Sequence, residues 1–192
     1  VQLDNSGQAS ITIADVDGGS SDNCQIDAQS ISENSFDCSD VGANTVTLTN
    51  TDPSGNTSSC DAIVTVEDTI APVAVCRDFT VQVDSSGLAP IQVADVDGGS
   101  SDNCAIAVRT VNPDTLDCSN IGSNALVFNV EDSSGNSDSC VVNVTIEDNI
   151  APTMICQDIT VDLDSSGSVS ITAADVDGGS FDNCAIATLT AV

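Results

Sequence analysis

An eleven-residue string rich in aspartate and glycine occurs three times in the chain. ADVDGGSSDNC occupies positions 14–24 and 94–104, and it recurs at 174–184 with Phe181 in place of serine. Each copy has three carboxylates, which bind hard cations such as Ca²⁺, and two glycines, which let backbone carbonyls approach an ion. The cysteine that ends each copy can form a disulfide. Since an isolated Asp-Gly pair is usually a solvated turn, the string predicts either a cation site or a plain turn.

The string marks a repeat of 80 residues. When positions 1–80 are set over 81–160 without a gap, 40 of 80 are identical, whereas the string keeps ten of its eleven positions in all three copies. This uneven retention favours a cation site over a turn. A unit of 80 residues is large enough to fold alone, so we expect tandem domains over 1–67, 68–147 and 148–192. Proline in both seams, at 72 and 152, predicts short and extended linkers.

The composition excludes several classes of function. The chain has 30 acidic and two basic residues and a net charge of −28, which excludes a nucleic-acid binder and makes cations the natural partners. It has no histidine, tyrosine or lysine, so the usual catalytic bases and nucleophiles are missing and we do not expect an enzyme. No long apolar run is present, so we expect no membrane insertion in this segment.

Hydrophobic residues alternate with polar ones along most of the second repeat, with turn residues between the alternating stretches. This period of two predicts about seven short β-strands, and none of the segments has a helical period. Short strands at this spacing indicate an all-β chain of tandem immunoglobulin-like β-sandwich domains in a rod or filament. The alternating sets are Phe79, Val81 and Val83; Ile91 and Val93; Ile106 and Val108; Leu126, Phe128 and Val130; Val142, Val144 and Ile146.

Two further strings, together with the repeated string, resemble a known family. The opening DTIAPVAVC, the ending DSSGNSDSCVVNVTIED and the two cysteines within them resemble the HYR (hyalin repeat) module, an immunoglobulin-like domain of extracellular adhesion proteins. The extra cysteine pair and the string ADVDGGSxDNC are most similar to tandem repeats of very large surface adhesins of Bacteroidetes, including gliding bacteria. The animal pattern has proline after its first cysteine, where this chain has Arg77 and Gln157.

In this sandwich topology, the loop after the second strand, the final hairpin and the entering linker lie at one end of the domain. Six clustered carboxylates repel one another unless a cation joins them. Ca²⁺, which takes six to eight oxygen ligands, fits better than Mg²⁺. The predicted ligands are Glu67, Asp68, Asp95, Asp97, Asp102 and Asp132 in the second repeat; Glu147, Asp148, Asp175, Asp177 and Asp182 in the third; and Asp15, Asp17, Asp22 and Asp52 in the first.

Nine regularly spaced cysteines in a small acidic repeat indicate disulfides and an oxidising, extracellular setting. The first and last strands of an immunoglobulin-like sandwich are neighbours, which pairs Cys76 with Cys140. The remaining cysteines of each repeat would then close short loops, Cys104 with Cys118 and Cys24 with Cys38. Cys60, Cys156 and Cys184 are left over, and the register places their partners outside this sequence.

These features together predict a structural, non-catalytic segment of a large secreted adhesin or extracellular filament at the cell surface. Its partners would be other repeats of the same long chain, identical chains bundled in a fibre, and cell-surface or substratum ligands at the tip. The alternative is a carbohydrate-binding or ligand-binding tandem module. Sugar platforms generally use exposed aromatic side chains, and of the four phenylalanines only Phe181 lies in a predicted loop.

Overall fold

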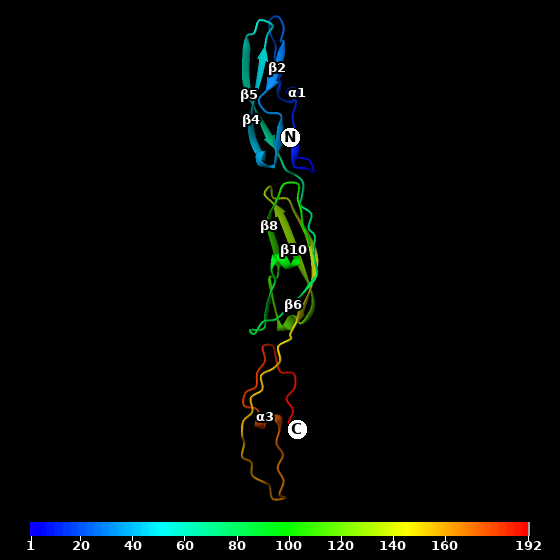
Figure 1. The fold of residues 1–192 in the computed structure, drawn as a ribbon, viewed down its shortest axis with the longest axis vertical. Coiled ribbons are helices and arrows are strands. Elements are labelled where there is room, and N and C mark those ends of the chain that lie inside the picture. The colour runs from blue at the N-terminus through cyan, green and yellow to red at the C-terminus, as the bar shows by residue number, and fades with distance from the viewer. Residues whose placement is uncertain (192) are drawn as a thin grey trace. The chain divides into compact units, whose positions relative to one another are not determined.

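The computed structural model describes residues 1–191 (Figure 1). The chain divides into two compact units. Unit 1 contains Val1–Val75, Gly98–Thr110 and Phe128–Cys140. Unit 2 contains Cys76–Asp97, Val111–Val127 and the chain from Val141 onward. Unit 1 thus combines the first repeat with two segments of the second, and unit 2 combines the rest of the second repeat with the third.

The first repeat, within unit 1, has two small antiparallel sheets. One has the order β2-β4-β5 and the other pairs β1 with β3. Figure 1 shows β4 and β5 as a long hairpin. The elements are β1 (Gln8–Ser10), α1 (Ile13–Val16), β2 (Ala28–Ile31), β3 (Ser35–Asp37), the 3₁₀ turn η1 (Cys38–Asp40), β4 (Gly42–Thr51) and β5 (Thr57–Val66).

Side chains from both sheets of the first repeat share one core. Phe36 of β3 packs in the same cluster as Val46 of β4 and Val64 of β5, together with Leu3 and Ile11. Along β4 and β5 the buried residues alternate with more exposed ones, because successive side chains of a strand point to opposite faces. Two sheets enclosing a common apolar layer are the defining feature of a β-sandwich.

The second repeat has a four-stranded sheet of order β6-β11-β10-β8 and a two-stranded sheet of β7 and β9. β6 pairs in parallel with β11, with Phe79 opposite Val144, so the first and last strands are neighbours as predicted. The elements are β6 (Phe79–Gln82), β7 (Leu88–Pro90), α2 (Val93–Val96), β8 (Ile106–Asn112), β9 (Thr115–Asp117), the 3₁₀ turn η2 (Cys118–Asn120), β10 (Gly122–Asp132) and β11 (Ser137–Glu147).

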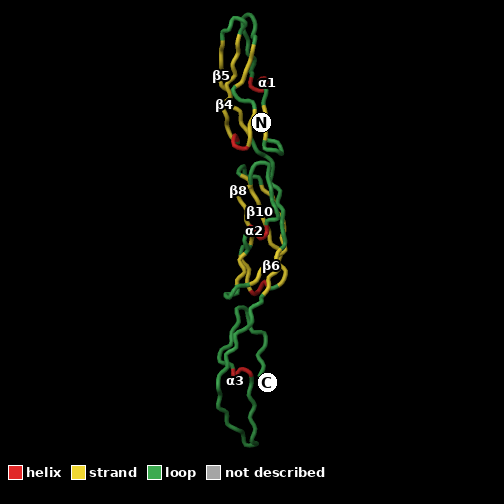
Figure 2. The backbone as a smooth tube through the Cα atoms, in the orientation of Figure 1, coloured by secondary structure: helices red, strands yellow, loops and turns green. Residues whose placement is uncertain are grey.

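Each copy of the repeated string begins in a four-residue helical turn, which the sequence did not predict. Figure 2 shows these turns as short red segments, with α1 and α2 near strands and α3 (Ala173–Val176) within loops. Val93, expected to continue a strand from Ile91, is instead the first residue of α2. The turn forms because the Asp95 carboxylate accepts a hydrogen bond from the Gln92 backbone amide at 3.2 Å, and this local bond replaces strand pairing.

The third repeat differs from the expected sandwich. Its described residues, 148–191, contain α3 (Ala173–Val176) and the isolated bridges Thr153–Phe181 and Cys156–Asp177, but no extended strand. The described residues of this repeat therefore contribute no strand to a sheet.

The prediction of an all-β fold built from β-sandwich modules is confirmed for the first two repeats. No helix among residues 1–191 is long and apolar enough to cross a membrane.

We predict that the Val130→Ala substitution lowers the free energy of unfolding by about 2 kcal/mol, because two methyl groups leave a close-packed core. Val130 is 0 % exposed. The matched control is Val127→Ala on the same strand, where the side chain is 42 % exposed and the loss should be below about 0.5 kcal/mol. Urea unfolding measures both, and equal losses would contradict the assigned burial.

Candidate metal centre at the repeat junction

Three aspartates converge in unit 1. Asp68 follows β5 in the linker, Asp102 lies in the loop before β8, and Asp132 ends β10. Each contributes one carboxylate oxygen to a group in which all such atoms lie within 4.8 Å of one another. Asp68 and Asp132 are 7 % and 3 % exposed. We call these three residues the aspartate triad.

The hairpin and linker hold two members of the triad in place. Asp132 accepts hydrogen bonds from the backbone amide of Asn136 at 2.8 Å and from its side-chain amide at 2.8 Å. The same Asn136 side chain donates to the backbone carbonyl of Asp68 at 3.1 Å. One asparagine therefore fixes the hairpin acid relative to the linker acid.

The repeated string supplies the third member. Asp102 accepts hydrogen bonds through Oδ2 from the backbone amides of Cys104 at 3.0 Å and Ala105 at 3.1 Å. The next residue, Asn103, donates from its side-chain amide to the Asp68 carboxylate at 3.1 Å. The Asp-Asn-Cys end of the string is thus the part that faces the linker.

Four buried oxygens in the two Asp-Asn-Cys loops have no hydrogen-bond partner among the described residues. They are Oδ1 of Asp102 and Oδ1 of Asn103, and in the third repeat Oδ2 of Asp182 and Oδ1 of Asn183. Buried polar atoms are almost always satisfied, and the same two residues are unsatisfied in both copies. Oxygen atoms held together without donors have the chemistry of a hard-cation site.

Close carboxylates also require a positive partner on electrostatic grounds. Two unit charges about 4 Å apart interact by about 4 kcal/mol at an effective dielectric of 20. With two basic residues against 30 acidic ones in the whole chain, most carboxylates must be neutralised from outside. A divalent ion does this for several oxygens at once.

Three of the six predicted ligands of the second repeat lie outside the triad. Asp95 makes the helical-turn bond described above, and Glu67 forms a backbone bridge with Gln2. Asp97 ends α2, where its backbone amide bonds to Val93 and the residue forms a bridge with Cys76. The Asp-Gly-Gly-Ser half of the string forms a turn, and cation binding by Glu67, Asp95 and Asp97 stays a prediction.

The first repeat shows what the first two aspartates of the string do. Asp15 accepts bonds from the Thr12 backbone amide and hydroxyl, which lower its pKa. The pKa of Asp17 is lowered further, chiefly by the side-chain amide of Gln29 and also by Ser20 and Gly19. Both carboxylates accept hydrogen bonds from residues of their own repeat.

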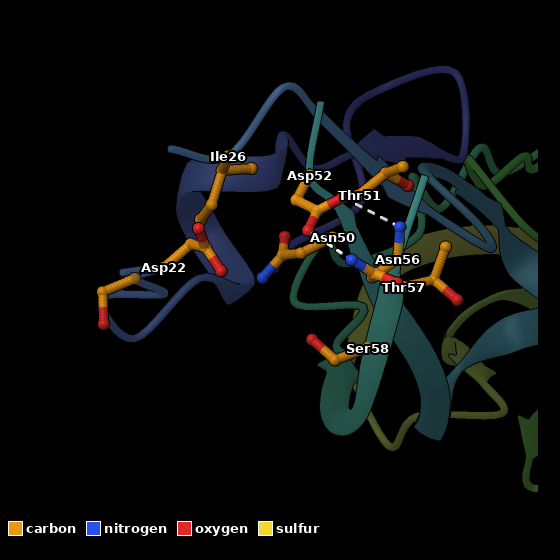
Figure 3. Close-up of a pocket in the computed structure, with 9 residues that line it drawn as sticks. Asp22, Ile26, Asn50, Thr51, Asp52, Asn56, Thr57 and Ser58 are labelled. Atoms are coloured by element: carbon orange, nitrogen blue, oxygen red, sulfur yellow. Dashed lines mark hydrogen bonds between the residues drawn. The ribbon is translucent and has the colours of Figure 1, made fainter. Parts of the chain in front are cut away.

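Asp22 and Asp52, the first-repeat equivalents of Asp102 and Asp132, line one pocket (Figure 3) of about 150 Å³. Asp52 is bonded to Asn56, as Asp132 is to Asn136. The position equivalent to Asp68 precedes residue 1. Two of the four acids predicted for this repeat therefore line one pocket, and cation binding by all four stays a prediction.

In the third repeat, Asn183 donates to the Asp148 carboxylate at 3.2 Å, and Asp182 bonds the backbone amide of Cys184. The Asp175 carboxylate accepts a hydrogen bond from the Thr172 backbone amide, and the Asp177 carboxylate accepts one from the Ser180 backbone amide. Among the described residues, these two acids and Glu147 are not part of a group of three possible metal ligands. Asp148 and Asp182 thus keep the geometry of Asp68 and Asp102.

The disulfides join successive repeats. Cys38 bonds to Cys104 and Cys118 bonds to Cys184, each across 66 residues, with Cα–Cα distances of 5.5 and 5.3 Å. Cys38 and Cys118 begin the 3₁₀ turns, and Cys104 and Cys184 end the repeated strings. We call each such contact, with the residues around it, the repeat junction.

The predicted short-loop pairs, Cys24 with Cys38 and Cys104 with Cys118, were wrong. Cys38 and Cys104 are bonded to each other and Cys118 is bonded to Cys184, so neither short loop closes. Cys184, expected to pair outside the sequence, pairs with Cys118.

The other cysteines divide into two groups. Cys76 and Cys140 are both disulfide-bonded, and their mutual pairing stays a prediction. Within residues 1–191, Cys24, Cys60 and Cys156 are free and exposed, and partners outside the sequence for the last two stay a prediction.

Glycine is required where the repeats meet. Gly7 and Gly87 have φ of +71° and +78°. A Cβ at Gly7 would lie 2.6 Å from Cys38 Sγ and 2.8 Å from the Asn103 carbonyl oxygen. A Cβ at Gly87 would lie 2.9 Å from Cys118 Sγ and 2.7 Å from the Asn183 carbonyl oxygen. The glycine turn of one repeat therefore packs directly on the Asp-Asn-Cys loop of the next.

No protein-family model matches the chain, and no curated protein matches it. Among solved structures, it is similar to protocadherin gammaB7 EC3-6 in a cis-dimer structure, with 18 % identity, a TM-score of 0.33, and coverage of 74 % of this chain and 46 % of that one. Protocadherin Gamma B7 extracellular cadherin domains 1-4 are 14 % identical, with a TM-score of 0.31 and coverage of 79 % of this chain and 49 % of that one. The human Desmocollin-1 ectodomain is 16 % identical, with a TM-score of 0.29 and coverage of 57 % of this chain and 28 % of that one. The chain covers under half of each of these structures, and similarity at this level assigns no function.

We predict that Gly87→Ala impairs formation of the Cys118–Cys184 disulfide and destabilises the chain by about 1–3 kcal/mol more than Gly167→Ala. Gly167 is a matched control because it has φ of +76° in the same Asp-Ser-Ser-Gly turn, with no heavy atom of the described residues within 4 Å of an added Cβ. Peptide mapping under non-reducing conditions and thermal unfolding measure both effects. Equal behaviour of the two variants would show that the junction is not closely packed.

We predict that Asp17→Asn destabilises the chain at pH 7 and that this difference shrinks in acid. Because hydrogen bonds lower the folded-state pKa of Asp17 below its ordinary 3.8, the ionised carboxylate stabilises the fold above that pH. Its contribution is lost as the pH falls from 3.8 through the folded-state pKa. Urea unfolding of both proteins between pH 2 and 7 tests this, and a pH-independent difference would contradict it.

Proposed function

We propose that the chain is a structural, non-catalytic segment of a secreted cell-surface adhesin or extracellular filament, in which a calcium ion and a disulfide join each repeat to the next. The aspartate triad carries this proposal, because its buried oxygens include an unsatisfied carboxylate and because Asp102 lies two residues from a cysteine bonded to the preceding repeat. The linker contributes Asp68 to the triad, the repeated string contributes Asp102 and the hairpin contributes Asp132.

The donor set supports calcium over other metals. Zinc prefers histidine and thiolate ligands, whereas the triad offers carboxylates. Magnesium keeps several of its waters and takes one or two carboxylates. A site with three carboxylates and neighbouring amide and carbonyl oxygens fits Ca²⁺, with water completing its coordination.

Cation and disulfide would act on different properties of the junction. The disulfide holds the ends of two repeats together but permits rotation about its bonds. A cation held by the linker and two loops restricts the angle between linker and module. Together they would stiffen a string of repeats, and both would be stable in an oxidising, calcium-containing extracellular medium.

The partners that follow from this function are neighbouring repeats of the same long chain, identical chains bundled in a fibre, and cell-surface or substratum ligands at the tip. Strong negative charge opposes bundling unless cations bridge the chains. The same charge opposes nucleic-acid binding. A carbohydrate-binding module is the second candidate, favoured by the 58 % exposure of Phe181.

We predict that Ca²⁺ raises the melting temperature, and that a chelator reverses the shift. Ligand at 100 times its dissociation constant stabilises the folded state by about 2.7 kcal/mol. Asp102→Asn and Asp132→Asn should each remove most of this gain, since each takes one charged ligand from the triad. Calorimetric titration and thermal unfolding measure affinity and stability.

Asp95→Asn is the matched control for these variants. It removes one charge from the same repeated string, but Asp95 bonds the Gln92 backbone amide instead of joining the triad. Its response to Ca²⁺ should equal that of the unmodified chain. Identical melting curves with calcium and with chelator for the unmodified chain would refute the proposal.

A further inference from the structure

Asn103 lies between the aspartate triad, the disulfide and the preceding repeat. Its side-chain amide nitrogen is 3.1 Å from the Asp68 carboxylate, 3.4 Å from the backbone carbonyl oxygen of Asp4 and 3.7 Å from Cys104 Sγ. Asp4 begins the turn that ends at Gly7, so this one amide group reaches the linker and the first repeat together.

The other end of the Asn103 amide is unsatisfied. Its Oδ1 is buried and has no hydrogen-bond partner in the described part of the chain. The amide oxygen and nitrogen are bonded to the same carbon, and the nitrogen contacts the Asp68 carboxylate. The oxygen is therefore also close to that carboxylate. Side-chain amide oxygens are common Ca²⁺ ligands, and bonds from the nitrogen to acceptors fix which end is the oxygen.

The same arrangement occurs at the second junction. Asn183 donates to the Asp148 carboxylate at 3.2 Å and to the Asp84 carbonyl oxygen at 3.2 Å, and its Oδ1 is also buried and unpartnered within residues 1–191. Asn23 of the first repeat, by contrast, is exposed. The arrangement therefore accompanies the junction and not the tripeptide as such.

We propose that Asn103 is the positioning residue that couples the cation site to the preceding repeat. Its amide oxygen contributes a neutral ligand to the ion, and its amide nitrogen then holds the Asp4 carbonyl and the Asp68 carboxylate. This inference rests on the proposed function, since it requires the ion. Cation binding should accordingly slow reduction of the neighbouring Cys38–Cys104 disulfide, because the ion stabilises the closed junction that the reductant has to open.

The test compares the unmodified chain with Asn103→Ala and Asn103→Asp. Calcium affinity is measured by titration calorimetry, and reduction of Cys38–Cys104 is followed by timed alkylation and mass spectrometry, with calcium and with chelator. Asn103→Ala should bind calcium about 10- to 100-fold more weakly and lose the protection of the disulfide. Asn103→Asp keeps an oxygen ligand, so its affinity should stay near that of the unmodified chain.

Asn103→Asp separates the two roles of the side chain. A carboxylate cannot donate a hydrogen bond to the Asp4 carbonyl, so calcium should bind but no longer slow reduction of Cys38–Cys104. A merely structural role would leave calcium affinity unchanged in every variant. Asn23→Ala is the control, since it makes the same substitution in an exposed Asp-Asn-Cys sequence and should change neither readout.

The outcomes distinguish this inference from the proposed function. Calcium binding that is lost in Asp132→Asn but unchanged in Asn103→Ala would overturn the role of Asn103 and leave the calcium junction intact. Absence of calcium binding by the unmodified chain would overturn both. If Asn103→Ala fails to form the Cys38–Cys104 bond during folding, Asn103→Asp still decides the question, because unchanged protection in that variant would refute the coupling.

Discussion

The structure depends on a surplus of buried oxygen where one repeat meets the next. Asp68, Asp102 and Asp132 bring carboxylates together, and the Asp102 and Asn103 side chains hold further oxygens without donors. Carboxylates held this close repel one another unless a positive ion joins them or they take up protons, because their repulsion grows as they leave water. The other features of the junction are its glycine turn and its disulfide. Both contact the Asp-Asn-Cys loop that also supplies Asp102 to the triad.

A small core makes this arrangement necessary. The first two repeats bury mainly valine, leucine and isoleucine, and a domain of about 80 residues leaves much of its apolar surface in water. Cross-links between repeats add stability without a larger core, since they restrict the unfolded chain. Because Cys38 and Cys104 are 66 residues apart, their bond closes a long loop, and it also makes folding of one repeat depend on the next.

Much of this could be predicted from sequence, and the failures have definite causes. Alternation predicted the strands, and sandwich topology predicted that Asp68, Asp102 and Asp132 converge. The pattern did not show that Asp95 and Asp97 serve a helical turn, since a local backbone bond leaves no periodic signal. The disulfides could not be assigned because a period of 80 makes a 14-residue spacing within one repeat equivalent to a 66-residue spacing between repeats.

The division of labour within the repeated string explains why it is kept almost unchanged. Its first half is required to build a turn whose carboxylates are satisfied locally, as the lowered pKa of Asp17 shows. Its second half has to meet three demands at consecutive positions: a carboxylate for the triad, an amide that reaches both the linker and the preceding repeat, and a sulfur at bonding distance from a 3₁₀ turn. The positions are linked through the backbone, because the Asp102 carboxylate accepts hydrogen bonds from the amides of Cys104 and Ala105. Strands need only the right apolar alternation, so they can vary between repeats, whereas the junction loop cannot vary without separating the linker from the preceding repeat.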